Sequence, residues 1–262
     1  MTVRLHRTVT GPVGAPALVL GSSLGTTHEL WNVQIPLLSR HFRVIAFDLR
    51  GHGGSPSPPG PYTIDDLGAD VLEMIDDLGL DRVAYAGLSI GAMIGMRVAS
   101  AAPERISALA LLCTSAKLGP AASWRERAAA VRAGGMAAIA DAQTDQIVGR
   151  WFTPGFATRS PDVVARCRAM LRDAVPEGYA ACCEAIATMD LLGDLSRIVA
   201  PTLVCAAASD LATPVEHSRA IVARIRDARL AIIDDAAHLA NVEQPAKVSD
   251  LLLEHFSVSA PR

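Results

Sequence analysis

A single serine stands at the centre of the chemistry that this sequence could perform. The run Gly87-Leu88-Ser89-Ile90-Gly91 follows an apolar stretch typical of a buried strand, and a helical pattern begins directly after it. Ser89 therefore falls on a tight strand-to-helix turn, a nucleophile elbow, where the hydrogen side chains of Gly87 and Gly91 relieve a clash. The alternative is an ordinary glycine-rich turn of a doubly wound fold. The pattern favours a nucleophilic serine, lifted above the sheet edge at a backbone strain of about 1–3 kcal/mol.

A nucleophilic serine needs a base, because its hydroxyl reacts poorly near neutral pH, and an imidazole titrates in the right range. His238 lies in the loop after the last predicted strand, and Asp210 follows the strand before it. The carboxyl ends of parallel strands share one edge of a sheet, so both side chains are expected near Ser89. We predict that His238 is the base and that Asp210 holds its tautomer, in the chain order typical of this elbow.

The other histidines and acids are weaker candidates because of their positions. His52 follows a strand in a glycine-rich loop, where a structural hydrogen-bonding role is expected. Asp234 and Asp235 are rivals for the acid, but they neighbour His238 in the sequence and are expected to point elsewhere. The remaining histidines lie on helices or far from the end of the last strand; they are His6, His28, His41, His217 and His255.

Attack on an ester carbonyl creates an oxyanion, which backbone N–H groups can stabilise. Ile90 begins the helix after Ser89, so its N–H has no partner within that helix. The small-residue loop 21–25 follows a buried strand and could supply the second donor. We nominate the N–H of Ser23 for that role, with Leu24 as the alternative.

Strands and helices alternate along both ends of the chain, which is typical of an α/β protein with a mainly parallel sheet. Buried strands are predicted at 17–20, 42–47, 83–87, 106–113, 201–206 and 229–234, with an edge strand at 3–9. Helices are predicted at 30–38, 63–78, 90–101, 215–226 and 243–256.

The pattern changes in the middle of the chain. Between about 117 and 194 only helical segments remain, at 124–132, 136–148, 161–174 and 177–189. We expect a helical lid there, over a core made of residues 1–116 and 195–262. Arginines in this segment could meet an anionic substrate, namely Arg125, Arg127 and Arg150. The predicted substrate contacts are Leu24, Trp124, Arg150 and Trp151.

Composition excludes several classes of function. The 262 residues are 50% apolar and 19% charged, and a net charge of −3 offers no attraction to nucleic acid or an anionic membrane. The five cysteines lack paired metal-ligand spacing and are expected to be buried thiols of a cytoplasmic protein. No signal peptide, membrane span, metal or cofactor is indicated, and the oligomeric state is left open.

The sequence resembles the α/β-hydrolases over essentially its whole length and, among them, the 3-oxoadipate enol-lactonases. The resemblance rests on these segments: 22–26 (SSLGT), 87–91 (GLSIG), 150–153 (RWFT), 178–180 (GYA), 183–186 (CEAI) and 210–214 (DLATP). It departs from them at Ala92, where a glycine is usual, and in the longer loop before His238. The resemblance implies an α/β-hydrolase fold with helices on both faces of the sheet and a lid after the sixth strand.

The same resemblance implies hydrolysis of the ring ester of 3-oxoadipate enol-lactone through an acyl-enzyme, in the breakdown of aromatic compounds. Its substrate carries a carboxylate, for which Arg150 is the preferred anchor. Three rivals keep the fold and change the substrate: a carboxylesterase, a C–C bond hydrolase and a perhydrolase. A fourth is a hydrolase-fold protein that binds a small ligand and turns over little.

Overall fold

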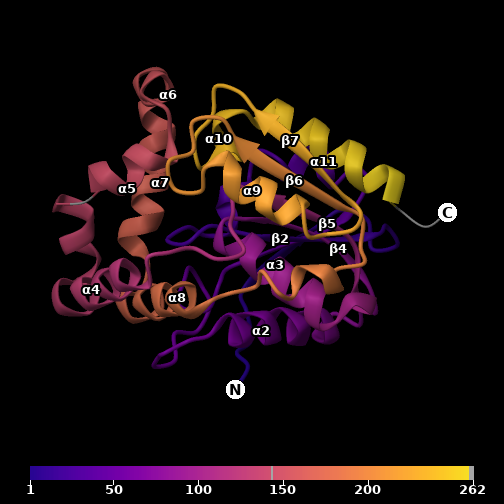
Figure 1. Ribbon diagram of the computed structural model, residues 1–262, viewed down its shortest axis with the longest axis horizontal. Helices are drawn as coiled ribbons and strands as arrows, with labels where there is room; N and C mark the ends of the chain where they lie inside the picture. The colour runs from indigo at the N-terminus through magenta and orange to yellow at the C-terminus, as the bar shows by residue number, and fades with distance from the viewer. Residues whose placement is uncertain (143, 260–262) are drawn as a thin grey trace.

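The computed structural model describes residues 1–142 and 144–259, and within them a central sheet carries the fold (Figure 1). Its seven strands lie in the order β1-β3-β2-β4-β5-β6-β7. They are β1 Arg7–Thr10, β2 Ala17–Gly21, β3 Arg43–Phe47, β4 Val83–Leu88, β5 Ile106–Leu112, β6 Thr202–Ala207 and β7 Ala228–Ile233. Only β1 of these described strands pairs antiparallel, with β3. The α/β-hydrolase type of sheet expected from the sequence is confirmed.

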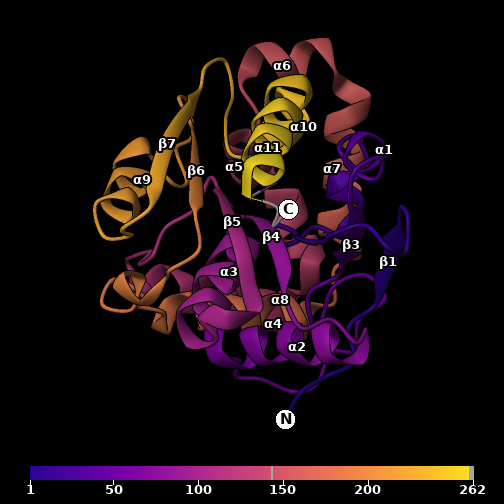
Figure 2. The same ribbon diagram turned by 90° about the vertical axis from the view of Figure 1, so that its right-hand side faces the viewer.

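Helices cover both faces of this sheet, as predicted (Figure 2). One face carries α2 Ile64–Asp77, α3 Ile90–Ala101 and α9 Val215–Val222, and the other carries α1 Ile35–Leu38 and α11 Pro245–Ser259. Every residue of β2 and β4 is buried, because helices on both sides exclude water from these central strands. The continuous apolar runs in the sequence reflect this double burial.

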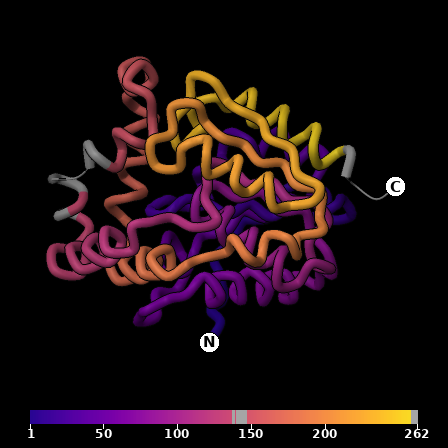
Figure 3. The backbone as a smooth tube through the Cα atoms, viewed as in Figure 1, coloured from indigo at the N-terminus to yellow at the C-terminus, as the bar shows by residue number. Residues whose placement is uncertain are grey.

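The helical insertion lies between β5 and β6, beyond one end of the sheet (Figures 1 and 3). It holds α4 Ala121–Ala142, α5 Thr144–Trp151, α6 Pro154–Arg159, α7 Pro161–Asp173 and α8 Pro176–Thr188. Five described strands precede it, so the expected place after a sixth strand is wrong by one. The five β-like runs before residue 117 already pointed to that count.

Proline and glycine account for two further differences from the predicted elements. The helix expected at 30–38 is divided into a 3-10 turn, His28–Trp31, and α1, which begins beside Pro36. Proline lacks an N–H and is tolerated only in the first turn, so the helix starts there. The helix expected at 124–132 lies in α4, and the one expected at 136–148 covers the end of α4 and the start of α5. α4 is kinked at Gly135 (φ 68°), between the two expected helices. Residue 143, inside the second of them, lies outside the described residues.

Local signals placed α2 correctly. Thr63 accepts a hydrogen bond from the Asp66 N–H at 3.1 Å, and the Asp66 carboxylate accepts one from the Thr63 N–H at 2.9 Å. This reciprocal cap satisfies two donors that a helix start leaves unpaired. It fixes the helix boundary at the residue that the sequence indicates.

Two further expectations concern the cysteines and membrane-spanning helices. All five cysteines are buried, and none of them is in a disulfide within the described chain. No described helix combines the length and the hydropathy that crossing a membrane would require.

Candidate active site

Ser89 occupies a strained turn between β4 and α3. Its backbone has φ 57° and ψ −119°, in the left-handed half of conformational space that L-residues avoid. A Cβ at Gly87 would lie 2.4 Å from the Gly91 carbonyl carbon, and one at Gly91 would lie 2.4 Å from the Gly21 carbonyl oxygen. The two glycines are therefore required by close backbone contacts. The turn is the elbow that the sequence pattern describes.

His238 and Asp210 meet at the carboxyl ends of β6 and β7. The His238 Nδ1 lies 2.8 Å from Asp210 Oδ2, and both side chains are buried. The other Asp210 oxygen accepts the N–H groups of Ala212 and Thr213 at 2.8 and 3.0 Å, while the Thr213 hydroxyl donates to Oδ2 at 2.6 Å. The carboxylate is thus fixed in one orientation toward the imidazole.

The surroundings of Asp210 keep it ionised. Burial alone would raise its pKa, but the charge and hydrogen bond of His238 and the donors of Thr213 lower the pKa of Asp210 to about 2. An ionised carboxylate at this distance favours a proton on Nδ1 of His238 and leaves Nε2 free to accept one. The rivals Asp234 and Asp235 are exposed, in agreement with the expectation that they point elsewhere.

Ser89 and His238 line one pocket of about 410 Å³ at this edge of the sheet. Within the described residues no hydrogen bond joins the Ser89 hydroxyl to the His238 ring. In enzymes without a bound substrate such a bond is often long and forms only in the complex. The arrangement brings an alcohol, an imidazole and an ionised carboxylate to a single cavity, which suits nucleophilic attack on a carbonyl.

The two backbone donors nominated for an oxyanion flank Ser89. Ile90 is the first residue of α3, and Ser23 lies in the loop after β2, where it lines the pocket. Neither N–H donates to a protein acceptor in the described part of the chain. His52 fixes the same loop, since its Nε2 accepts the Gly25 N–H at 3.0 Å and its Nδ1 faces the Arg50 carbonyl oxygen at 3.2 Å. Burial lowers the pKa of His52, which fits the structural role expected for it.

The walls of the pocket come from both the core and the insertion. The predicted contacts Leu24, Trp124, Arg150 and Trp151 all line it, together with Arg127 and Tyr179. Arg125 is exposed and is not among the lining residues. Tyr179 lies in the segment 178–180 that carries part of the family resemblance, but it was not predicted as a substrate contact, because its helix carries no polar motif that points to a ligand.

A family model for the alpha/beta hydrolase fold matches residues 16–245, which include the elbow, Asp210 and His238. The chain belongs to the α/β-hydrolase fold family. The hydrolase is also 39% identical to 3-oxoadipate enol-lactonase 2 of Acinetobacter baylyi, over 93% of this chain and 89% of that protein.

Solved structures of relatives share the fold of this hydrolase. The enol-lactonase of Burkholderia xenovorans is 37% identical, with a TM-score of 0.93 and 97% of each chain covered. A thermophilic esterase from Thermogutta terrifontis, solved with malate bound, is 28% identical, with a TM-score of 0.91, covering 99% of this chain and 95% of that one.

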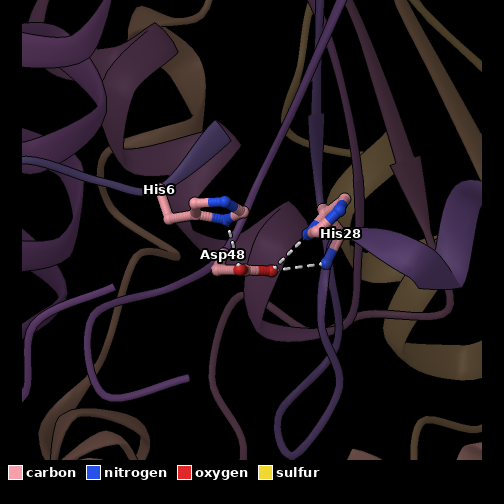
Figure 4. Close-up of side chains that lie close together, drawn as sticks. All are labelled: His6, His28 and Asp48. Atoms are coloured by element: carbon pink, nitrogen blue, oxygen red, sulfur yellow. Dashed lines mark hydrogen bonds and ion pairs between the residues drawn. The ribbon is translucent and has the colours of Figure 1, made fainter. Parts of the chain in front are cut away.

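A second cluster of polar side chains in the hydrolase consists of His6, His28 and Asp48 (Figure 4). Asp48 Oδ1 accepts the His28 N–H at 2.7 Å and lies 2.9 Å from His28 Nδ1. Its Oδ2 lies 2.8 Å from His6 Nδ1 and accepts the Gly54 N–H at 3.0 Å. We call this arrangement the Asp48 clamp. It joins the N-terminal segment, the loop before α1 and the loop after β3.

Two imidazoles and a carboxylate this close are also a set that could hold a metal ion. Each Asp48 oxygen, however, already faces two nitrogen atoms, and one in each pair is a backbone N–H. Backbone donors cannot be lost by deprotonation, so they compete with a cation for the carboxylate. The clamp is therefore explained as a hydrogen-bonded structural element.

Glu243 connects the loop that carries His238 to the insertion. This buried carboxylate accepts the Ala237 N–H at 2.9 Å and the Thr153 N–H at 3.1 Å, and the Thr153 hydroxyl also donates to it. Sequence reasoning missed it, because Glu243 reads as an ordinary acid at the start of the last helix. Only the fold brings it to Thr153, 90 positions earlier.

Proposed function

We propose that this hydrolase opens the ring ester of 3-oxoadipate enol-lactone through a covalent acyl-enzyme on Ser89. One observation carries the proposal: Ser89 sits on a strained elbow in the same pocket as His238, whose Nδ1 faces a buried, ionised Asp210. A protein that only binds ligands has no chemical need for this set. The hydrolysis of an ester through an acyl-enzyme on serine uses all three groups.

The proposed mechanism assigns a role to each group. His238 takes the hydroxyl proton as Ser89 attacks the ring carbonyl, and the N–H groups of Ile90 and Ser23 stabilise the oxyanion. The tetrahedral intermediate collapses, the ring C–O bond breaks, and the enolate that leaves takes the proton from His238 and becomes the ketone. The leaving group stays tethered, so a water molecule activated by His238 must hydrolyse the acyl-enzyme and release the dicarboxylate product.

The relatives support this choice of substrate. Two proteins with the name enol-lactonase match more than nine-tenths of the chain at 37% and 39% identity. The solved structure of the esterase from Thermogutta terrifontis has malate, a small dicarboxylate anion, bound. A lactone that carries a carboxylate matches both observations.

The test is the loss of the ultraviolet absorbance of the enol-lactone on addition of enzyme. Wild type is expected to turn over the lactone, and Ser89→Ala to lose at least about 10³-fold in kcat, because no other group attacks the carbonyl. A Ser89→Ala variant as active as wild type would contradict the mechanism. Hydrolysis of simple esters without any hydrolysis of the lactone would contradict the proposed substrate.

A carboxylesterase is the second candidate, favoured by the structural match to the esterase from Thermogutta terrifontis. The machinery is the same and only the substrate differs. Comparing kcat/KM for the lactone with that for 4-nitrophenyl butyrate separates the two. Labelling of Ser89 by a fluorophosphonate tests the further possibility of a ligand-binding protein, in which the serine would not react.

A further inference from the structure

Thr213 contacts both members of the pair that prepares Ser89 for attack. Its hydroxyl donates to Asp210 Oδ2 at 2.6 Å, and the same hydroxyl oxygen lies 3.5 Å from His238 Nδ1. The side chain is buried, and the residue also lines the pocket that holds Ser89. The hydroxyl is therefore located at the place where the acid and the base meet.

The two oxygens of the Asp210 carboxylate have different partners. Oδ1 accepts the backbone N–H groups of Ala212 and Thr213, which do not depend on the side chain at position 213. These two bonds already fix the direction in which the carboxylate points. Oδ2 accepts the Thr213 hydroxyl and faces the imidazole of His238. The further effect of the hydroxyl therefore falls on the oxygen that the base uses.

An oxygen that accepts two hydrogen bonds divides its charge between two donors. At 2.6 Å the bond from the Thr213 hydroxyl is in the short range of O–H···O⁻ bonds, which are about twice as strong as neutral ones. The 3.5 Å contact between that hydroxyl oxygen and Nδ1 is too long for a strong hydrogen bond. Burial raises the pKa of Asp210, whereas His238 and the donors of Thr213 lower it, as expected of groups that share its charge.

We propose that Thr213 is a positioning residue whose hydroxyl limits how strongly Asp210 stabilises the imidazolium of His238. This inference rests on the proposed acyl-enzyme mechanism and deepens it, since it assigns control of the base to a fourth side chain. His238 can take the Ser89 proton only while its ring is neutral. Without the hydroxyl, more of the charge on Oδ2 faces the imidazole, so the ring becomes protonated at a higher pH and the base is lost there.

Other charged or titratable groups line the pocket or contact the loop that carries His238. They are Arg127 of α4, Arg150 of α5, Tyr179 of α8, Glu243 of α10 and Cys113, which follows β5. Burial and the charge of Asp210 raise the pKa of the Cys113 thiol, which is therefore uncharged. A substitution at Thr213 changes none of these groups. A difference between wild type and such a variant therefore reports the hydroxyl.

The experiment measures kcat/KM for 4-nitrophenyl butyrate between about pH 4 and pH 9, because the acid limb of this profile reports protonation of the base in the free enzyme. Thr213→Val removes the hydroxyl and keeps the branched shape of the side chain. We expect it to move the midpoint of the acid limb upward by about 0.5–1 pH unit. Thr213→Ser keeps a hydroxyl and should restore the wild-type midpoint.

Thr202→Val is the matched control. It removes a buried hydroxyl, which donates to the Ala200 carbonyl oxygen at 2.8 Å, from the opposite end of β6. Its midpoint should equal that of wild type. A Thr213→Val enzyme with a lower kcat/KM at every pH and the wild-type midpoint would overturn the proposal, because the hydroxyl would then only orient the carboxylate. A midpoint that moves downward would overturn it as well.

The rate at which a fluorophosphonate labels Ser89, measured against pH, gives a second readout that needs no turnover. Thr213→Ala also lacks the hydroxyl, so the midpoint of its labelling rate should move upward as in Thr213→Val; an unmoved midpoint in both variants would overturn the proposal. Wild type that is inactive on the enol-lactone, while the aryl ester shows the Thr213 effect, would refute the lactonase function alone and support the role of Thr213.

Discussion

At the scale of single residues, the environment decides which of several similar groups is suited to chemistry. Asp210, Asp234 and Asp235 follow the last two strands, and all three are carboxylates. Only Asp210 is buried, and only its oxygens face His238 and the donors of Thr213. These contacts orient the carboxylate and keep it charged, whereas Asp234 and Asp235 are exposed and make no hydrogen bond to His238 in the described part of the chain.

Asp210→Asn should therefore disable the enzyme while leaving its shape intact. The amide would offer an N–H to Nδ1, which forces the imidazole into the tautomer that has no free lone pair on Nε2. We expect kcat for 4-nitrophenyl butyrate to fall by about 10⁴, the loss known for such a replacement in a serine protease. Asp234→Asn is the matched control. An equal loss of kcat in that variant would rule out Asp210 as the acid that orients His238.

At the scale of elements, the insertion is joined to the active-site loop at one junction. The N–H of Leu239 donates to the Trp151 carbonyl oxygen at 3.0 Å, and the N–H of His238 donates to that of Arg150 at 3.4 Å. Glu243 adds its bonds to Thr153 and Ala237 on either side. The end of α5 and the His238 loop are thus held as one unit, so a change in one should move the other.

Replacing Glu243 by Gln tests this coupling. The amide keeps the volume of the side chain, but its NH₂ group cannot accept a hydrogen bond and is left against a backbone N–H. We expect kcat to fall about 10-fold at 25 °C, since small errors in the placement of His238 weaken proton transfer. Kinetics with 4-nitrophenyl butyrate measure this effect. Glu216→Gln, at an exposed position of α9, is the control and should match wild type.

The same contrast explains how much the sequence could predict. The elbow, the start of the helix predicted at 63–78 and the buried strands depend on neighbours within a few positions, so local patterns were sufficient to place them. The contacts of Glu243 with Thr153, and of His6 with Asp48, join residues 90 and 42 positions apart. No pattern in a single sequence encodes such pairings. Pro36 was a local signal that the helix predicted at 30–38 is divided, but the helical periodicity of this segment obscured it.

At the scale of the whole molecule, the Asp48 clamp connects segments without catalytic residues to the edge of the sheet that holds the active site. His6 precedes the edge strand β1, His28 follows the loop that presents Ser23, and Gly54 lies in the loop after β3. Burial alone would raise the pKa of Asp48, but hydrogen bonds from His28 and Gly54 lower it from 3.8 to about 2. The same contact raises the pKa of His28.

These shifts predict how stability depends on pH. A carboxyl with a lowered folded-state pKa contributes stability above the pKa of the unfolded chain and loses it as the pH falls toward 2. The pKa of His28 shifts upward, so its contribution to stability is complete below its ordinary pKa and is lost as the pH rises through the raised pKa. The clamp is therefore most stabilising in mildly acidic solution, between these two limits.

The variant Asp48→Asn should reveal this pH dependence of stability in urea unfolding. The lowering of the Asp48 pKa from 3.8 to about 2 corresponds to about 2 kcal/mol of unfolding free energy at pH 6. At pH 3 the carboxyl of the unfolded chain is mostly protonated, so the difference between wild type and variant should shrink to roughly half. Asp81→Asn, an exposed position, should cost little at either pH. A penalty for Asp48→Asn that is the same at pH 6 and pH 3 would show that the clamp acts through packing, because a contribution from charge must weaken as the carboxyl gains its proton.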